Sequence, residues 1–108
     1  MALTGTGEKP FLEYEVDEVA KKLRILRTYV PPRMRGRGLA RILLEEALSF
    51  ARERGLSVEP LCSYALQYFV ANREARDMLI EELRGLSDEE LKRALNERRS
   101  WESSENRG

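Results

Sequence analysis

The sequence contains no histidine and a single cysteine, Cys62, in 108 residues. One thiol excludes an internal disulfide, and a zinc site built by this chain alone would lack its usual imidazole and thiolate ligands. The absence of histidine also removes the most frequent general base and every Ser-His or Cys-His pair. We therefore expect no metal site, and any proton transfer falls to carboxylates, tyrosines, the thiol or water.

The chain also has no formal net charge, because 19 Lys and Arg residues balance 19 Asp and Glu residues. Without a global field, neither nucleic acid nor a membrane surface is an expected partner. The apolar runs are short, and the first residues have neither the charged segment nor the apolar stretch of a signal peptide. These features predict a cytoplasmic protein with one folded domain.

The N-terminal half begins with a pattern typical of a β-hairpin. Strands are expected over residues 11–16 and 23–30, where aromatic and β-branched residues are frequent. Residues 17–22 join them as a turn, and are also compatible with one turn of helix. Pro31 and Pro32 end the second strand, because proline supplies no amide to a ladder.

A helix followed by a third strand is expected next. Apolar residues recur at helical spacing over residues 38–54, and Gly55 stands at the position of a left-handed C-cap. Residues 56–62 are typical of a short strand, in which Pro60 indicates a bulge or an edge. The order strand, helix, strand predicts a βαβ unit.

The remaining residues predict helices. A short helix is expected over residues 63–71 and a second over residues 73–84, with Asn72 as its N-cap. A capping box that begins at Ser87 opens a last helix that runs to about residue 99. The predicted organisation is a flexible lead-in (1–10), a folded domain (11–85), a C-terminal helical extension (86–101), which is either core or a partner surface, and a disordered tail (102–108).

The segment from Arg33 to Gly38 reads R-x-x-G-x-G and lies between the two prolines and the long helix. Glycines let the backbone curl with its N–H groups pointing inward, and the helix N-terminus that follows adds partial positive charge. The segment therefore predicts a pyrophosphate site, against the alternative of a glycine-rich turn with solvated arginines. A Walker loop is excluded, because no Gly-Lys-Ser or Gly-Lys-Thr is present.

Strand, prolines, R-x-x-G-x-G and long helix together resemble the acetyl-CoA motif of the GNAT acetyltransferases. The stretches Phe11-Leu12-Glu13-Tyr14, Thr28-Tyr29-Val30-Pro31 and Glu59-Pro60-Leu61-Cys62-Ser63-Tyr64 are similar to the minimal GNAT-like proteins of about this length. The resemblance spans residues 11 to about 80. It implies a mixed α/β fold: a GNAT-like sheet with an antiparallel N-terminal hairpin, a βαβ unit that carries the cofactor loop, and C-terminal helices.

The same resemblance implies which residues hold acetyl-CoA. The pantetheine arm would pair with the backbone of the second strand, and the pyrophosphate would meet the glycine loop and the first helical turn. The implied residues are Thr28, Tyr29, Val30, Arg33, Arg35, Gly36, Arg37, Gly38, Leu39 and Ala40, with Asn72 and Arg73 in a similar Asn-containing turn. Minimal members often have His where this chain has Arg27, so a role that needs an imidazole there does not apply.

Cys62 is the candidate catalytic residue, because by the resemblance it lies near the acetyl thioester. Three interpretations remain open: a nucleophile that takes the acetyl group and passes it on, a thiol that lines the pocket, or a small buried hydrophobe. Glu13, Tyr14 and Tyr64 are candidate proton acceptors for an incoming amine.

The function expected from these features is transfer of acetyl from acetyl-CoA to an amine on a small molecule or a protein. The alternative is a CoA-binding module without turnover, with a regulatory or interaction role. A nucleic-acid binder that uses the arginines is disfavoured by the neutral charge. The sequence specifies neither the acceptor nor the oligomeric state.

Overall fold

The structure is a computed structural model that describes residues 9–107. Residues 1–8 of the predicted lead-in and residue 108 lie outside the described part. In chain order the elements are β1 (Phe11–Asp17), β2 (Lys22–Tyr29), the 3-10 helix η2 (Pro32–Met34), α1 (Leu39–Arg54), β3 (Ser57–Pro60), α2 (Ser63–Ala71), the 3-10 helix η3 (Arg73–Met78), α3 (Glu81–Arg84) and α4 (Asp88–Arg107). No helix in this part of the chain combines the length and apolar character needed to cross a membrane.

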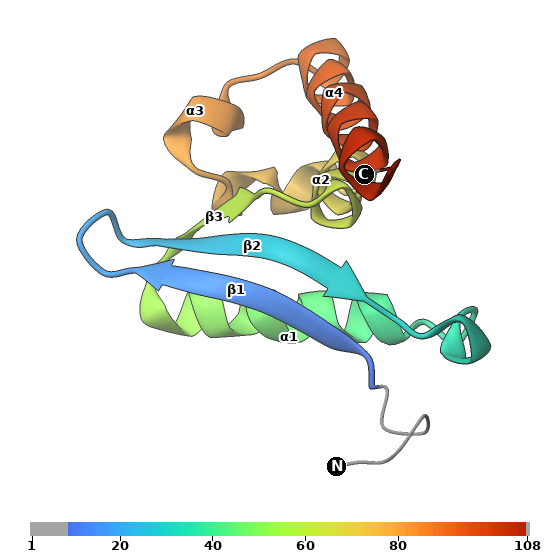
Figure 1. The fold of residues 1–108 in the computed structure, drawn as a ribbon. Helices are drawn as coiled ribbons and strands as arrows, with labels where there is room; N and C mark the ends of the chain where they lie inside the picture. The colour runs from blue at the N-terminus through green and yellow to red at the C-terminus, as the bar shows by residue number, and fades with distance from the viewer. Residues whose placement is uncertain (1–8, 108) are drawn as a thin grey trace.

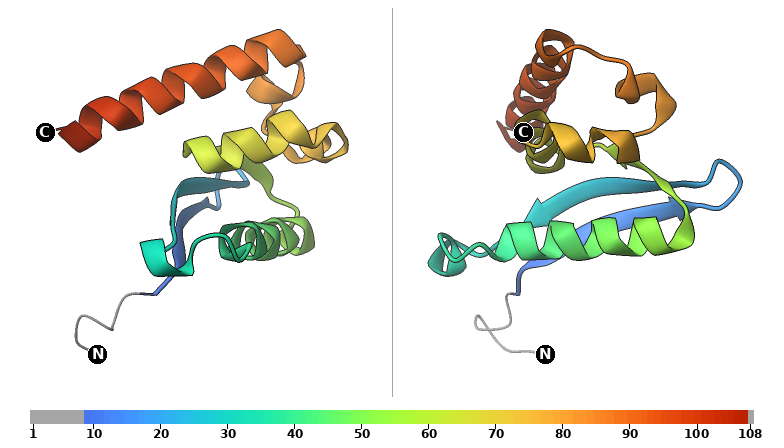
Figure 2. Two further views of the ribbon diagram at one scale, coloured as in Figure 1. Left: turned by 90° about the vertical axis from the view of Figure 1, so that its right-hand side faces the viewer. Right: turned by 180° about the vertical axis from the view of Figure 1, so that it is seen from behind.

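The strands form one mixed sheet in the order β1-β2-β3. β1 pairs antiparallel with β2, and β2 pairs parallel with β3, so the predicted hairpin, βαβ unit and α/β class are confirmed. The register shifts between Glu13 and Tyr14, which marks a bulge. The sheet lies between α1 and the C-terminal helices (Figure 1), and α4 forms the outermost layer beyond α2 (Figure 2).

A single cluster of apolar side chains joins these layers. It contains Leu23 and Ile25 of β2, Leu44 and Leu48 of α1, Val58 of β3, Phe69 of α2, and Leu91 and Leu95 of α4, all buried. Burial of one such side chain stabilises the fold by roughly 1.5–3 kcal/mol. The last helix is therefore part of the core.

The capping signals at Gly55 and Ser87 are used as predicted. Gly55 has φ 69°, and its N–H donates to the carbonyls of Ala51 and Arg52 at the end of α1. At the start of α4, the Ser87 N–H donates to Glu90 Oε1 at 2.9 Å, and the Glu90 N–H donates to Ser87 Oγ at 3.2 Å. These bonds satisfy backbone groups that a helix end leaves without partners.

The helix predicted over residues 73–84 is wrong. Instead, η3 and α3 are separated by Leu79 and Ile80, which have extended backbone. Leu79 forms a bridge with Val58 on the outer side of β3, and the Ile80 N–H donates to the Val58 carbonyl at 3.0 Å. Burying Leu79 and pairing an edge carbonyl offset the lost helical bonds. Asn72 does not cap this segment, because its side chain donates to the Tyr68 carbonyl.

The disordered tail predicted from Glu102 is also wrong, because α4 continues to Arg107. The Glu102 carboxylate accepts hydrogen bonds from the Ser63 N–H at 2.9 Å and the Ser63 hydroxyl at 2.6 Å. These bonds hold the late turns of α4 against the N-terminus of α2, where a carboxylate is favoured. A polar composition alone did not reveal this long-range contact.

The opposite end of α2 is joined to the start of α4 by arginines. Arg76 donates to the carbonyls of Phe69 and Val70 and pairs with Asp88 at 2.6 Å, and Arg73 pairs with the same carboxylate. Hydrogen bonds from Arg76, and then from Arg73, hold the pKa of Asp88 below its ordinary value. Helices α2 and α4 thus lie antiparallel, with a polar contact at each end.

Candidate functional site

The loop between η2 and α1 adopts the curl that its glycines predict. Gly36 has φ 84° and Gly38 has φ 74°, both in the left-handed region that other residues rarely adopt. No atom lies within 4 Å of a Cβ built at either glycine, so a side chain there would be strained by the backbone conformation rather than by a neighbour. The loop is fixed to β2 by the Arg35 Nε–H, which donates to the Val30 carbonyl at 3.0 Å.

Backbone N–H groups of this loop and of the first turn of α1 are left without acceptors. Within the described chain, none of the amides of residues 36–41 donates to a protein group, and the first bond of the helix runs from Ile42 N–H to the Gly38 carbonyl. The same amides stand at the positive end of a long helix. Amides without acceptors at a helix N-terminus are chemically suited to an anionic ligand.

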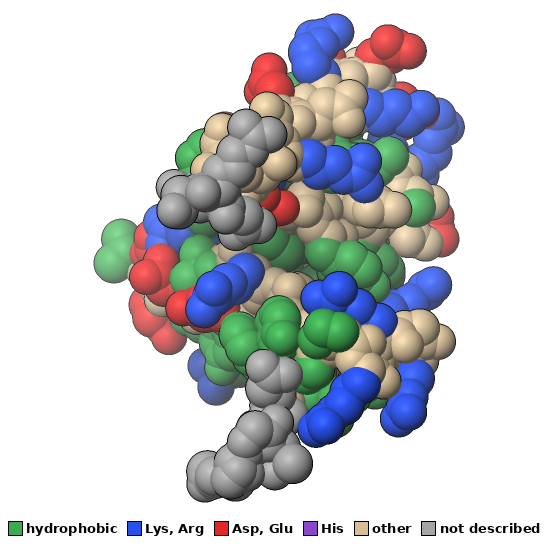
Figure 3. Space-filling model, turned by 45° about the vertical axis from the view of Figure 1, so that its right-hand side comes forward, with side chains coloured by type: hydrophobic (Ala, Val, Ile, Leu, Met, Phe, Trp, Pro, Cys, Tyr) green, Lys and Arg blue, Asp and Glu red, His purple; other side chains and the backbone are tan. Residues whose placement is uncertain are grey.

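Guanidinium groups surround these amides. Arg33, Arg35 and Arg37 are exposed on the loop, and Figure 3 shows Lys and Arg side chains gathered at the lower right, where this end of the molecule comes forward. Arg41 follows one helical turn later and pairs with Glu45 at 2.9 Å. The local charge is therefore positive although the chain as a whole is neutral.

A pocket of about 290 Å³ opens beside the loop. The structure brings predicted residues from the end of β2, from the loop and from α1 to its wall, together with Met34, Arg41 and Tyr64. The lining residues are Thr28, Tyr29, Val30, Met34, Arg35, Gly36, Gly38, Leu39, Ala40, Arg41 and Tyr64. Arg33 and Arg37 stay on the exposed loop beside it. Asn72 and Arg73 are not brought to it, because they lie at the far end of α2.

β2 extends beyond β3 at this pocket. The last backbone bond between them runs from the Leu61 N–H to the Ile25 carbonyl at 2.9 Å, after which the chain turns into α2. The end of β2, from Thr28 to Tyr29, is paired with β1 on one side only in the described chain. Its other edge is open to an extended ligand.

A second pocket of about 420 Å³ adjoins the first, since Thr28 and Tyr64 line both. Its wall comes from β2, from the start of α2 and from α4. The lining residues are Leu26, Arg27, Thr28, Cys62, Ser63, Tyr64, Arg98, Trp101 and Glu102. Ligands bound in the two pockets would thus meet near Thr28 and Tyr64.

A model of the protein family described as GCN5-related N-acetyl-transferase matches residues 1–78. The chain belongs to this family. The match confirms the resemblance to GNAT acetyltransferases, and it includes β1 through η3. Helices α3 and α4 lie outside the part that the N-acetyltransferase model covers.

Cys62 is buried, with 4% of its surface exposed. It is the N-cap of α2, where its Sγ accepts a hydrogen bond from the Ala65 N–H at 3.4 Å. The Thr28 hydroxyl lies 3.7 Å from the same sulfur. The thiol therefore has a structural task at the helix start as well as a place in the pocket wall.

The three candidate proton acceptors differ in position. Tyr64 lines both pockets, and its partial burial raises the pKa of the phenol above its ordinary value. The Tyr64 phenol is therefore protonated at neutral pH, and its role as a proton acceptor stays a prediction. Glu13 pairs with Arg27 on the hairpin, and Tyr14 stacks against Phe50 of α1, so neither lines these two pockets.

Sequence reasoning missed Arg98, Trp101 and Glu102. All three were assigned to the C-terminal extension or its tail, whereas they line the second pocket. Their spacing was the available signal, since i, i+3 and i+4 lie on one face of a helix.

Proposed function

We propose that this protein binds acetyl-CoA, with the pyrophosphate on the amides of residues 36–41, and transfers the acetyl group to an amine in the adjoining pocket. The observation that carries the proposal is this run of amides without acceptors, at the start of α1 and at the mouth of the first pocket. Family membership supports the same donor.

Each part of the site has a physical task in this proposal. The open edge of β2 at Thr28 and Tyr29 orients the pantetheine arm, as a strand would be oriented. Bound acetyl-CoA would supply the acetyl group: an amine that has lost its extra proton to water forms a bond from nitrogen to the thioester carbonyl carbon, and the carbon–sulfur bond breaks with CoA as the leaving group. The Tyr64 phenol carries its proton at neutral pH, can donate it to the sulfur that becomes negative as the carbon–sulfur bond breaks, and regains a proton from the amine nitrogen as the amide forms. Holding both partners in adjoining pockets supplies proximity.

The test of the proposed function combines calorimetry with a thiol-release assay. Acetyl-CoA should bind more tightly than ATP or inorganic pyrophosphate, and free CoA thiol should appear when an amine is added. Equal affinity for all three anions would mean a nonspecific basic patch and would contradict the proposal. Tight acetyl-CoA binding without thiol release across a broad amine panel would favour the alternative, a CoA-binding module without turnover.

We further propose that Cys62 supports the site without forming a covalent intermediate. Its sulfur is buried and already accepts the Ala65 N–H, and the Glu102 carboxylate bound to Ser63 places negative charge beside any thiolate. Direct transfer then needs no thiol nucleophile.

The Cys62→Ser variant provides the test, because serine keeps a capping oxygen at the start of α2. We expect wild-type acetyl-CoA affinity and turnover within a few-fold of wild type, whereas Cys62→Ala should also lose about 1 kcal/mol of stability with the cap. Intact-protein mass spectrometry should show no acetylated wild-type protein after incubation with acetyl-CoA alone. An acetyl adduct at Cys62 that disappears when amine is added would establish the covalent route instead.

A further inference from the structure

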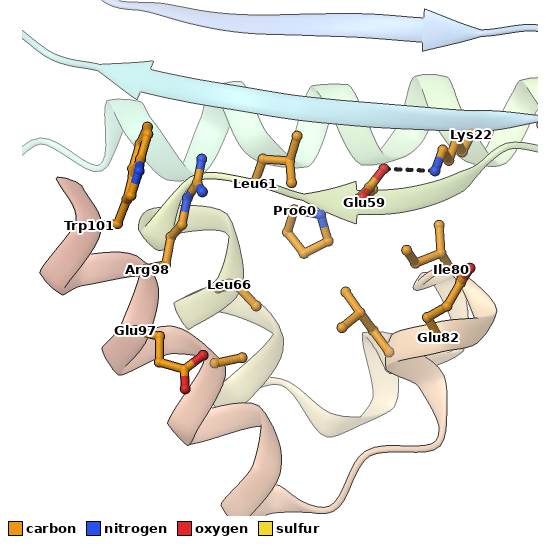
Figure 4. Close-up of a pocket in the computed structure, with 12 residues that line it drawn as sticks. Lys22, Glu59, Pro60, Leu61, Leu66, Ile80, Glu82, Glu97, Arg98 and Trp101 are labelled. Atoms are coloured by element: carbon orange, nitrogen blue, oxygen red, sulfur yellow. Dashed lines mark ion pairs between the residues drawn. The ribbon is translucent and has the colours of Figure 1, made fainter. Parts of the chain in front are cut away.

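The outer wall of the second pocket is formed by α4, which the family match does not include. Arg98, Trp101 and Glu102 follow each other at helical spacing on the side of α4 that faces the fold. Figure 4 shows Arg98 and Trp101 extending side by side from α4 toward the sheet. This chain therefore adds its own side chains to the place where the proposed acceptor would bind.

Arg98 carries a charge that the protein does not neutralise. Its Nε atom is buried and has no hydrogen-bond partner, and its guanidinium lies 4.2 Å from the centre of the Trp101 ring. Within the described residues Arg98 forms no salt bridge, and unlike the exposed loop residues Arg33, Arg35 and Arg37, which also form none, it has a buried Nε atom. A buried donor without an acceptor is costly, so an anionic group in this pocket would be stabilised by Arg98.

Glu102 supplies the opposite charge in the same pocket. Two hydrogen bonds from Ser63, the residue after Cys62, fix its carboxylate in the wall of the second pocket. A carboxylate with one or more free lone pairs can accept from an ammonium group. The two charges therefore match an acceptor with a cationic amine near Glu102 and an anion near Arg98.

A third pocket, of about 470 Å³, continues along α4 and shares Arg98 and Trp101 with the second. Its apolar wall contains Pro60, Leu61, Leu66, Ile80 and Leu83 (Figure 4). Glu59, Glu82 and Glu97 also line it, and of these three only Glu59 is ion-paired within the described chain, with Lys22 at 2.9 Å and with Arg24 at 3.2 Å. An apolar group is therefore favoured there, and an acidic group is repelled.

We propose that the acceptor is a free amino acid with an apolar side chain. The role of this amino acid as acetyl acceptor rests on the proposed function, whereas its binding site does not. Glu102 holds the ammonium, Arg98 holds the carboxylate, and the side chain passes Trp101 toward the apolar wall. A peptide N-terminus lacks the free carboxylate beside its amine, and a polyamine would leave Arg98 without a partner.

The test uses Trp101, the only tryptophan in the sequence, as a fluorescent reporter. The full chain, with and without CoA, is titrated with L-leucine, L-leucinamide, 3-methylbutylamine and 4-methylpentanoate, which share one side chain but differ in their charged groups. Leucine should bind at least about tenfold more tightly than each of the other three, because each lacks one charged partner. L-Aspartate should bind more weakly than leucine.

Variants on α4 distinguish the effect of the Arg98 charge on ligand affinity from any effect on folding. Arg98→Gln should lower leucine affinity at least about tenfold, to the level of 3-methylbutylamine, and leave affinity for that amine within about twofold. Arg93→Gln, an exposed position outside these pockets, is the matched control and should change neither affinity. Ligand-dependent shifts of the melting temperature give a second measure of binding that does not depend on the environment of Trp101.

Each outcome has one meaning. Equal binding of leucine and 3-methylbutylamine, an unchanged leucine affinity in Arg98→Gln, or no leucine-dependent change in either fluorescence or melting would overturn the inference. If leucine binds with the expected dependence on Arg98 but acetyl-CoA is neither bound nor consumed, the inferred site stands and the proposed function fails. If amines are acetylated without regard to a carboxylate, the proposed function stands and the inference fails.

Discussion

The Gly38→Val variant is expected to lose acetyl-CoA binding while α1 remains folded. Gly38 has φ 74° and directly precedes α1, and a β-branched residue does not adopt this conformation without strain. Relaxing the backbone would turn the amides of residues 36–41 away from a common centre. Losing two amide bonds to a charged group, at roughly 1.5–3 kcal/mol each, weakens Kd at least about a hundredfold.

Gly55→Val is the matched control for this experiment. Gly55 has φ 69° at the other end of the same helix, and like Gly38 it has no atom within 4 Å of an added Cβ. The two variants should lose similar stability in thermal melts, but only Gly38→Val should lose calorimetric affinity. Arg37→Ala should have a much smaller effect, because it removes one exposed side chain. Wild-type affinity in Gly38→Val would show that the loop is not the cofactor site.

Removing residues 86–108 is expected to abolish the cooperative melting transition or to make the protein insoluble. The deletion removes Leu91 and Leu95 from the core and uncovers the buried side chains of α2 against which α4 packs. Truncation of one buried leucine to alanine usually costs about 2–5 kcal/mol, and a domain of this size has about 5–15 kcal/mol in total. The region matched by the family model is therefore not expected to fold by itself.

Single substitutions on α4 show how much stability its buried side chains contribute, for comparison with the deletion of residues 86–108. Leu91→Ala, at a fully buried position, should lower the melting temperature by several degrees, whereas its exposed neighbour Lys92→Ala should leave it nearly unchanged. If the deleted chain melts like the full chain, α4 is an appendage that contributes nothing to stability. Circular dichroism melts of the variants distinguish these results.

The sequence predicted those parts of the fold that depend on local signals. Alternating residues, two prolines and the Gly55 cap are each recognised within a few positions of the chain, so the hairpin, α1 and the βαβ order were correct. The glycine loop was found for the same reason, because positive φ and a helix start are local requirements.

The errors came from contacts between distant residues. Leu79 leaves a helical pattern because it pairs with Val58 across the edge of the sheet. The turns after residue 99 are helical, and Glu102 among them reaches Ser63, 39 positions earlier. Neither contact can be found from propensity or composition. The pocket wall on α4 was missed for the same reason. A helical stripe of Arg, Trp and Glu is typical of a solvent-exposed face, and only the contact with the rest of the fold shows that it lines a pocket.

Because α2 and α4 lie antiparallel, the two pockets of the site take their walls from distant parts of the chain and can be substituted independently. The loop amides belong to a stretch early in the chain, whereas the wall opposite Cys62 belongs to the final helix. Substitutions at Arg98 or Trp101 therefore alter one compartment and leave the backbone of the other untouched. Selection for a new acceptor can therefore act on the pocket-facing residues of α4, provided that Leu91 and Leu95 continue to anchor the helix.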